Sequence, residues 1–460
     1  MRPCADRRIW SHAMSASLPG DRFLVRPGAD DMPTSADAIV IGGGPTGAAA
    51  CWALERAHPG IRTILIEREE RLGAGSSLAS LENYRTCWPA LPLMAQMRRS
   101  VEVFHHADDE LSEGASASIH LKERGYLFLA MTDSHAASLR SDVAHLHSIG
   151  LRHIEYLDHD EVQRRFPTIG RAVIAAKWDP IAGWLDSNAL IHAFVRAAPH
   201  ARVLLGIDGT TITHESGRVV GVHTPYGTIH APIVVLAAGG WAPVVARESG
   251  IALPVILRPR QSFTTGYRHA GFTDDMPMLI GESPSPHVRP EAGTGAIFGW
   301  EYRWHSKWAP ELTPNPDHDA VLEPSDHLAR LKDPRFPSLT LALLARQFDH
   351  GEGEGFNDPK YLRGLHHNIG YYVYRDETAA YRVDADGSRH GYESERAIIC
   401  PHPDVSGLIL SVAHVGHGVM TAPAAGELAA AHALGLALPD PHYAGFGLDV
   451  PYVDQDAPVL

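Results

Sequence analysis

Three glycines near the start of the sequence have the spacing of a phosphate-binding turn. Gly42, Gly44 and Gly47 form the pattern G-x-G-x-x-G, with Pro45 and Thr46 between the second and third glycine. The first glycine of such a pattern permits a tight turn, the second lets the backbone approach a pyrophosphate, and the third lets a helix pack closely on a strand. Free N–H groups at the start of the following helix can bind the phosphate oxygens. These residues therefore predict a site for a dinucleotide.

The flanking residues predict the elements that must position this turn. Residues 37–41 form a short apolar run with β-branched side chains, and residues 63–67 form a second one that ends in Glu67. The segment 48–56 between them is rich in helix formers and is followed by the helix breaker Pro59. The order strand, glycine turn, helix, strand and acid is that of a dinucleotide-binding unit, in which Glu67 accepts hydrogen bonds from ribose hydroxyls.

The remainder of the sequence favours FAD as the dinucleotide. It has no second G-x-G-x-x-G pattern, which an enzyme with separate domains for FAD and a pyridine nucleotide usually shows. Small and polar residues follow Glu67, end a buried strand at 237–241, and form a glycine-rich turn at 415–420 before a helical segment. The dipole of that last helix can stabilise negative charge on a reduced flavin. Besides the glycine turn and Glu67, the residues predicted to bind FAD are Arg68, Ser76, Ser77, Ala238, Gly239, Trp241, Gly416, His417, Gly418, Val419 and Met420.

The composition argues against several other classes of protein. The chain has 460 residues with 40 basic and 54 acidic side chains, so its net charge is −14. This balance argues against a nucleic-acid partner. The four cysteines include no C-x-x-C pair, and no histidine has a known ligand spacing, so no metal is predicted. Residues 405–426 lack charged side chains but contain Pro423 and several glycines, so we expect a buried segment, no membrane span and a cytoplasmic protein.

Three parts of the sequence resemble the D-amino-acid oxidase / sarcosine oxidase superfamily of FAD-dependent oxidoreductases, and in particular its sarcosine and dimethylglycine dehydrogenase-like branch. The first is the turn G-G-G-P-T-G-A-A at 42–49 together with Glu67. The second is the strand end A-A-G-G-W at 237–241. The third runs from I-I-C-P-H-P at 398–403 to G-H-G-V-M at 416–420 and is the most specific of the three.

The resemblance covers roughly residues 36–445 and includes a further segment, 178–186, that is similar to the family's P-x-x-G-x-x-D. It implies an α/β fold in which a Rossmann-like FAD-binding domain is interleaved with a mixed β-sheet substrate domain. The segment 375–397 is longer than its counterpart in the family, and its Asp386-Gly387 pair predicts an inserted hairpin. We expect the FAD-binding domain in 36–115, 171–255 and 396–445, the substrate domain in 116–170 and 256–395, a flexible leader in 1–35, and a tail in 446–460.

The resemblance also suggests which residues meet the substrate. Counted from Gly75-Ser76, Arg85 takes the place of an arginine that pairs with the substrate carboxylate, and the fork of a guanidinium can bind a carboxylate through two hydrogen bonds. His417 is expected to border the flavin rather than to act as a general base. These two are the candidate catalytic residues. Ile297 stands where monomeric sarcosine oxidases have a lysine that helps oxygen react, so O2 and another electron acceptor both remain open.

The segments where some family members attach FAD covalently lack the required side chains. Residues 371–375 contain no cysteine and residues 76–90 contain no histidine, so we expect non-covalent FAD. Together these features indicate an FAD-dependent oxidoreductase that oxidises a C–N bond of an amino acid or related amine to an imine, by hydride transfer to flavin N5. Two alternatives stay open: a flavoprotein that oxidises a 2-hydroxy acid, and a non-catalytic flavin-binding protein.

Overall fold

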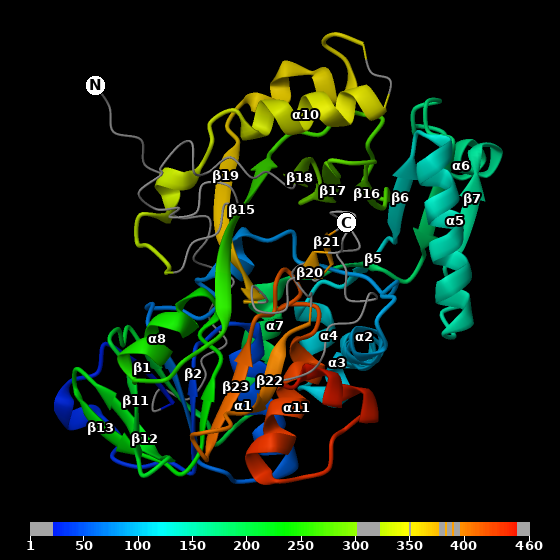
Figure 1. Cartoon of the computed structure of the whole chain (residues 1–460). Coiled ribbons are helices and arrows are strands. Elements are labelled where there is room, and N and C mark those ends of the chain that lie inside the picture. The colour runs from blue at the N-terminus through cyan, green and yellow to red at the C-terminus, as the bar shows by residue number, and fades with distance from the viewer. Residues whose placement is uncertain are drawn as a thin grey trace, which may run out of the picture.

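Two large β-sheets form the centre of the structure, and each takes strands from several separate parts of the chain (Figure 1). The computed structural model describes residues 22–300, 323–348, 351–376, 382–383, 389–390 and 396–448. None of the helices in these ranges combines the length and the apolar character that crossing a membrane requires.

The first sheet has seven strands in the order β1-β10-β3-β2-β14-β23-β22, and all neighbouring strands are parallel except β22 and β23. Its strands are β1 (Phe23–Val25), β2 (Ala38–Ile41), β3 (Thr63–Glu67), β10 (Arg202–Leu205), β14 (Val234–Leu236), β22 (Ile398–Pro401) and β23 (Leu408–Val412). A parallel sheet of this kind places the loops after its strands at one common edge, where nucleotides bind.

Both faces of this sheet are covered. One face packs against α1 (Pro45–Ala57), α7 (Ser187–Arg196) and α11 (Ala422–Leu434). The other packs against α8 (Ala242–Glu248) and a small antiparallel sheet of β11 (Thr211–Glu215), β12 (Arg218–Thr224) and β13 (Gly227–His230). Within β2, Val40 joins the core on the first face and Ile39 the core on the second. The strands are therefore continuous apolar runs, as buried parallel strands require.

The second sheet has eight strands of mixed direction in the order β19-β15-β18-β17-β16-β6-β8-β7. They are β6 (Tyr126–Ala130), β7 (Glu155–Asp158), β8 (Ala175–Asp179), β15 (Val255–Thr265), β16 (Met278–Ile280), β17 (His287–Glu291), β18 (Gly295–Gly299) and β19 (His366–Arg375). Helix α10 (Phe336–Gln347) packs on one face through an aromatic core that includes Phe263 and Phe298. Helix α5 (Asp133–Ser148) packs on the other face at β6 and β8, on the right in Figure 1.

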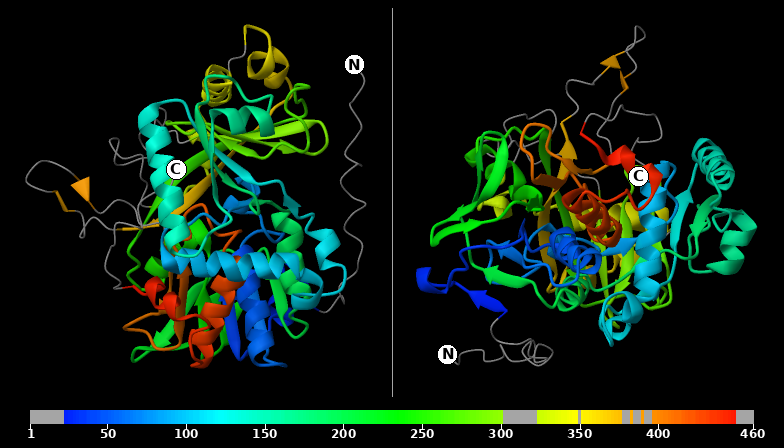
Figure 2. Two further views of the ribbon diagram at one scale, coloured as in Figure 1. Left: turned by 90° about the vertical axis from the view of Figure 1, so that its right-hand side faces the viewer. Right: turned by 90° about the horizontal axis from the view of Figure 1, so that it is seen from below.

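A small sheet and a long helix lie near the contact between the two large sheets. Strand β9 (Gly183–Trp184) pairs with both β4 (Asn83–Tyr84) and β5 (Lys122–Glu123). Helix α2 (Leu91–His105) crosses the middle of the molecule in the left-hand view of Figure 2. The other α-helices in the described ranges are short, namely α3 (Ala107–Glu110), α4 (Ala115–Ser118) and α6 (His159–Arg165).

The predicted α/β class is confirmed by the mainly parallel sheet and the helices that cover it. Strands of the two large sheets follow one another in blocks along the chain, so the sheets are interleaved. One predicted boundary is wrong. Strand β8 falls in the range 171–255, which was assigned to the FAD-binding domain, but it pairs with β6 and β7 in the eight-stranded sheet. The pairing of β8 with β6 joins segments about 50 residues apart, so no local pattern in the sequence predicts it.

The predicted flexible leader is wrong for residues 22–35. Strand β1 extends the seven-stranded sheet by pairing in parallel with β10. Arg22 precedes this strand and donates hydrogen bonds to the carbonyls of Val195 in the last turn of α7 and of Ala198 and Ala201 in the connection from α7 to β10. A cation is favourable at the C-terminal end of a helix, where carbonyl groups lack intrahelical partners.

Two other predicted segments lie largely outside the described residues. In the segment 375–397, the short strands β20 (Arg382–Val383) and β21 (Arg389–His390) pair antiparallel, as an inserted hairpin requires. The predicted turn at Asp386-Gly387 is not among the described residues. The same is true of residues 1–21 and of the tail after residue 448.

Replacement of Arg22 by alanine should destabilise the protein, because three carbonyls in α7 and in its connection to β10 lose a charged donor. Hydrogen bonds to charged groups contribute about 2 kcal/mol, so we expect the midpoint of urea unfolding to fall clearly. Arg26→Ala is the matched control, since that exposed side chain forms a surface ion pair with Glu70. Equal midpoints for the two variants would contradict the role of Arg22.

Candidate cofactor and substrate site

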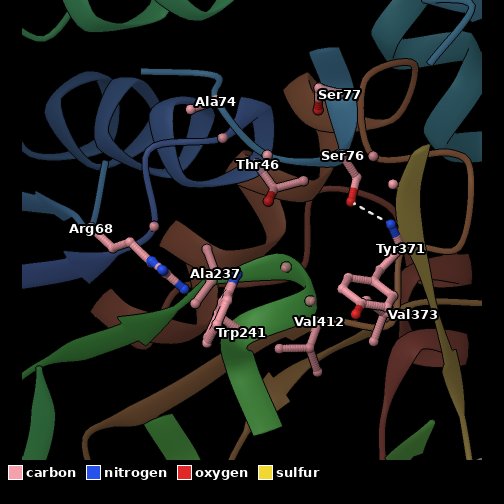
Figure 3. A pocket seen from close by; sticks show the side chains of 18 of the residues that line it. Thr46, Arg68, Ala74, Ser76, Ser77, Ala237, Trp241, Tyr371, Val373 and Val412 are labelled. Carbon is pink, nitrogen blue, oxygen red and sulfur yellow. Dashed lines mark hydrogen bonds between the residues drawn. The ribbon is translucent and has the colours of Figure 1, made fainter. Parts of the chain in front are cut away.

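A cavity of about 550 Å³ lies at the carboxyl ends of β2, β3, β14 and β23. Its wall is completed by η2 (Ser76–Ala79), by part of β19, and by the turn after β23. Figure 3 shows that its labelled side chains come from both large sheets and from the loops between them. The edge of a parallel sheet at which strands end is where α/β folds bind nucleotides.

The glycine turn brings helix α1 close to strand β2. Gly42 has φ +114°, and a Cβ there would lie 2.4 Å from the carbonyl oxygen of Ala237. A Cβ on Gly47 would lie 2.0 Å from the carbonyl oxygen of Gly42. Gly44 is the N-cap of α1, and the space around its Cβ position is open. The first and third glycines therefore serve close packing, while the second leaves room for a phosphate at the helix N-terminus.

Glu67, at the end of β3, holds the turn in place. Its Oε2 accepts a hydrogen bond from the N–H of Gly43 at 2.6 Å, and its Oε1 accepts one from the N–H of Glu69 at 2.9 Å. Burial raises the pKa of this carboxyl group above its usual range. Carboxylate oxygens accept more than one hydrogen bond, so Glu67 can also accept from a ligand hydroxyl in the cavity that it lines.

Arg68 and Trp241 form a stacked pair in the cavity wall (Figure 3). The guanidinium carbon of Arg68 lies 3.6 Å from the centre of the Trp241 ring. Its Nη2 forms an ion pair with Asp326 at 2.8 Å. Its Nη1 is buried and has no hydrogen-bond partner among the described residues. An unsatisfied charged donor beside a cavity is a natural partner for a polar ligand group.

The other end of the cavity is formed by the turn that follows β23. Ala413 and Val415 have φ +58° and +51°, a region that is unfavourable for a β-branched residue such as Val415. The N–H of Val415 donates to the carbonyl of Val373 in β19 at 3.0 Å, so the turn is held by the second sheet. His414 lies between Ala413 and Val415 in the sequence. Burial lowers the pKa of its imidazole to about 4, so this group is neutral at pH 7. Strained backbone of this kind persists only where the surrounding structure holds it.

A hydrogen bond also joins β19 of the second sheet to η2 in the cavity wall. The N–H of Tyr371 in β19 donates to Oγ of Ser76 at 2.9 Å (Figure 3). The hydroxyl of Tyr371 accepts from the N–H of Ser325 at 3.0 Å, and Ser325 and Leu328 also line the cavity. Sequence reasoning missed these residues, because no local pattern marks the segment around Ser325.

Most residues predicted to bind FAD lie in the cavity wall, and three do not. Gly47 serves the contact between α1 and the glycine turn, Met420 packs in the apolar core, and His417 packs edge-on against Trp88. Those that line the cavity are Gly42, Gly44, Pro45, Thr46, Glu67, Arg68, Ser76, Ser77, Ala238, Gly239, Trp241, Gly416, Gly418 and Val419.

Arg85 and His417, the two candidate catalytic residues, are linked by Trp88. The guanidinium carbon of Arg85 lies 4.0 Å from the centre of the Trp88 ring, and the rings of Trp88 and His417 are 4.4 Å apart in an edge-on arrangement. Arg85 is only 3% exposed, and it has no carboxylate partner among the described residues. The sequence analysis did not predict a role for Trp88. An aromatic residue three positions after the arginine is a sequence feature that could have indicated this contact.

The cavity fits an extended dinucleotide. One end offers an open helix N-terminus and the unsatisfied Nη1 of Arg68. The turn at the other end, residues 412–419, contains His417, whose ring contacts the buried Trp88 and through it Arg85. Polar groups therefore lie where a nucleotide needs them, and a buried cation lies near the far end.

Comparison with known proteins agrees with this arrangement. A family model described as FAD dependent oxidoreductase matches residues 37–432. Sarcosine oxidase subunit beta from Arthrobacter sp is 25% identical over 241 residues, which are 50% of this chain and 58% of that protein. Mitochondrial sarcosine dehydrogenase from Mus musculus is 24% identical over 65% of this chain and 33% of its own length. The alignments thus span less than two thirds of these relatives.

Solved structures share the fold over nearly the whole chain. Glycine oxidase from Geobacillus kaustophilus has a TM-score of 0.69 at 19% identity, covering 91% of this chain and all of that one. L-proline dehydrogenase from P. horikoshii has a TM-score of 0.67 at 21% identity, covering 89% of this chain and 96% of that one. Since the family model also matches most of the sequence, this chain belongs to the FAD dependent oxidoreductase family, whose cofactor is FAD.

Proposed function

We propose that this protein oxidises the C–N bond of an amino acid or a related amine to an imine, with FAD bound non-covalently in the cavity. The observation that carries the proposal is the position of Arg85, a buried cation without a carboxylate partner in the described part of the chain. Arg85 contacts the ring of Trp88, and Trp88 contacts the ring of His417 in the turn that ends the cavity. The names of the relatives, which act on sarcosine, glycine or proline, support a substrate that carries both an amine and a carboxylate.

The cavity wall divides naturally between the parts of FAD. The N-terminus of α1 and the glycine turn would hold the pyrophosphate. Glu67 and the Arg68–Trp241 pair would hold the adenosine half. Ser76 and the turn at 412–419 would hold the flavin half. Each group is already held in position by contacts within the protein, so little reorganisation is needed on binding.

When bound, FAD would accept a hydride from the carbon next to the nitrogen of the neutral amine, which leaves the protonated imine (an iminium ion) for water to hydrolyse. The hydrogen leaves with its electron pair, so the protein needs no strong general base for this step. Its own task is to bind and orient the substrate. The planar fork of Arg85 can hold a carboxylate through two hydrogen bonds, and stacking on Trp88 fixes the plane of that fork.

An anaerobic absorbance titration of the purified holoprotein tests this proposal. The panel contains sarcosine, dimethylglycine, proline, D- and L-amino acids, simple amines and 2-hydroxy acids. We expect the flavin bands to bleach with an amine or amino acid, and the rate of reoxidation in air then separates an oxidase from a dehydrogenase. Bleaching by 2-hydroxy acids alone would replace the proposal with hydroxy-acid oxidation. A flavin that no compound bleaches would instead support a non-catalytic role.

Replacement of Trp241 by leucine should weaken FAD binding, because the Arg68 guanidinium loses the ring on which it stacks. Such contacts are worth about 0.5–2 kcal/mol, so we expect the dissociation constant of FAD to rise about tenfold. Titration of apoprotein with FAD, followed by fluorescence, measures this constant. Trp241→Phe keeps a ring face and should retain most of the affinity. The proposed adenosine site fails if the leucine variant binds FAD as tightly as the wild type.

Replacement of Arg85 by alanine should weaken binding of the amino acid by more than tenfold, or about 1.4 kcal/mol, because its carboxylate loses a buried charged partner. Arg85→Lys should restore the charge but not the two-hydrogen-bond geometry. Both are measured as the apparent affinity in the flavin titration.

A matched pair of ligands supplies the control for Arg85. Proline and pyrrolidine differ by the carboxylate alone, so Arg85→Ala should weaken binding of proline and leave binding of pyrrolidine unchanged. A smaller than tenfold effect on proline, or an equal effect on both ligands, would reject Arg85 as the carboxylate-binding group.

A further inference from the structure

The carboxylate of Asp179 is fully buried at the end of strand β8 and accepts hydrogen bonds from the residues that follow Arg85. Its Oδ2 accepts from the backbone N–H of Thr86 at 2.7 Å and from that of Cys87 at 3.1 Å. The hydroxyl of Thr86 also donates to this carboxylate, at 2.9 Å from Oδ2 and 3.0 Å from Oδ1. One carboxylate thus holds two consecutive peptide units and a side chain.

The segment held by Asp179 sets the position of Arg85. The N–H of Trp88 donates to the carbonyl of Thr86 at 2.8 Å, and the indole N–H of Trp88 donates to the carbonyl of Arg85 at 3.0 Å. The guanidinium of Arg85 then stacks on the same indole ring. Because the ring is fixed by its own hydrogen bond, the direction of the Arg85 fork follows from the conformation of residues 85–88.

Strand pairing also holds the segment around Arg85 in place. Residues Asn83 and Tyr84 of β4 pair with Trp184 and Gly183 of β9, which follows β8 after three residues. The segment from β8 to β9 therefore contacts the segment around Arg85 at two points. The first contact is a backbone ladder, and the second is the Asp179 carboxylate.

Charge gives Asp179 a role that a neutral side chain cannot fill. Arg85 and Lys177 both contact the ring of Phe128, with their cationic groups 5.6 Å and 4.5 Å from its centre. Lys177 lies 3.3 Å from Asp142, so that cation has its own partner. Asp179 supplies a further negative charge in this buried region, and Nε2 of His153 lies 3.9 Å from its Oδ1. The link from Asp179 to Arg85 therefore runs through the backbone of residues 86 and 87, whose N–H groups bind a charged acceptor more strongly than a neutral one.

We propose that Asp179 is a positioning residue, which orients the Arg85–Trp88 pair for a substrate carboxylate without touching the substrate itself. The proposal rests on the proposed function, in which Arg85 binds that carboxylate. It assigns to Asp179 an effect on the affinity for carboxylates, distinct from any effect on the stability of the fold.

The test uses Asp179→Asn and Arg85→Ala, singly and together, in the holoprotein. The probe is acetate, a carboxylate that the protein does not need to oxidise, and its binding is measured from the change in the flavin spectrum. We expect Asp179→Asn to raise the dissociation constant of acetate about tenfold. In the Arg85→Ala background the same change should have no further effect, since two residues that act through one contact are not additive.

The readouts separate positioning from a purely structural role. If Asp179 acts through Arg85, proline should lose affinity in Asp179→Asn while pyrrolidine does not, and kcat should change little. Asp158→Ala is the stability control, because it removes the N-cap of α6 on the neighbouring strand without touching residues 85–88. That variant should unfold more easily and still bind acetate normally.

Should Asp179→Asn fail to fold, Thr86→Val provides a second measurement. It removes the hydroxyl and keeps both backbone donors to Asp179, so a smaller loss of acetate affinity, about threefold, is expected. Additive effects of the Asp179 and Arg85 variants, or an equal loss for proline and pyrrolidine, would overturn the proposal. If Arg85→Ala alone leaves acetate binding unchanged, the carboxylate site of the proposed function fails as well, whether or not an amine reduces the flavin.

Discussion

The close approach of helix α1 to the glycine turn is the constraint on which the rest of the site depends. There is no room for a side chain at Gly47, where a Cβ would lie 2.0 Å from the carbonyl of Gly42. On the opposite side of α1, a Cβ on Gly426 of α11 would lie 2.5 Å from the backbone of Ala49. Small residues on both sides of α1 thus bring two helices against the sheet, and their N-termini lie at the edge where the cavity forms.

This packing also determines the turn between β23 and α11. With both flanking elements fixed, residues 413–421 must connect them, and Ala413 and Val415 in this connection take up left-handed backbone conformations. The hydrogen bond from Val415 to Val373 shows that the second sheet supports the turn. The strained turn and the long strand β19 therefore form one wall of the cavity together.

The other side of the site depends on residues 83–88, which lie between the two sheets. They pair with β9 through β4, are held by the Asp179 carboxylate of β8, and reach His417 through Trp88. The buried charged groups of the site differ in the partners that they have within the protein. Asp179 and Glu67 accept several hydrogen bonds within the protein, whereas Arg85 has no carboxylate partner in the described ranges. A buried cation without a carboxylate partner is costly, and a ligand carboxylate would lower that cost.

The sequence by itself determined those parts of the protein that depend on short spacings. The glycine turn, Glu67 and the run around Gly416 can be recognised from short spacings along the chain, and most of the residues predicted from them line the cavity. The tertiary structure alone decided the placement of β1 and β8, the role of Trp88 next to Arg85, and the contacts of Asp179. Each of these rests on pairing or packing between segments far apart in the chain. Such contacts leave no periodic or spacing signal in the sequence, because their geometry is set by the sheets that bring the segments together.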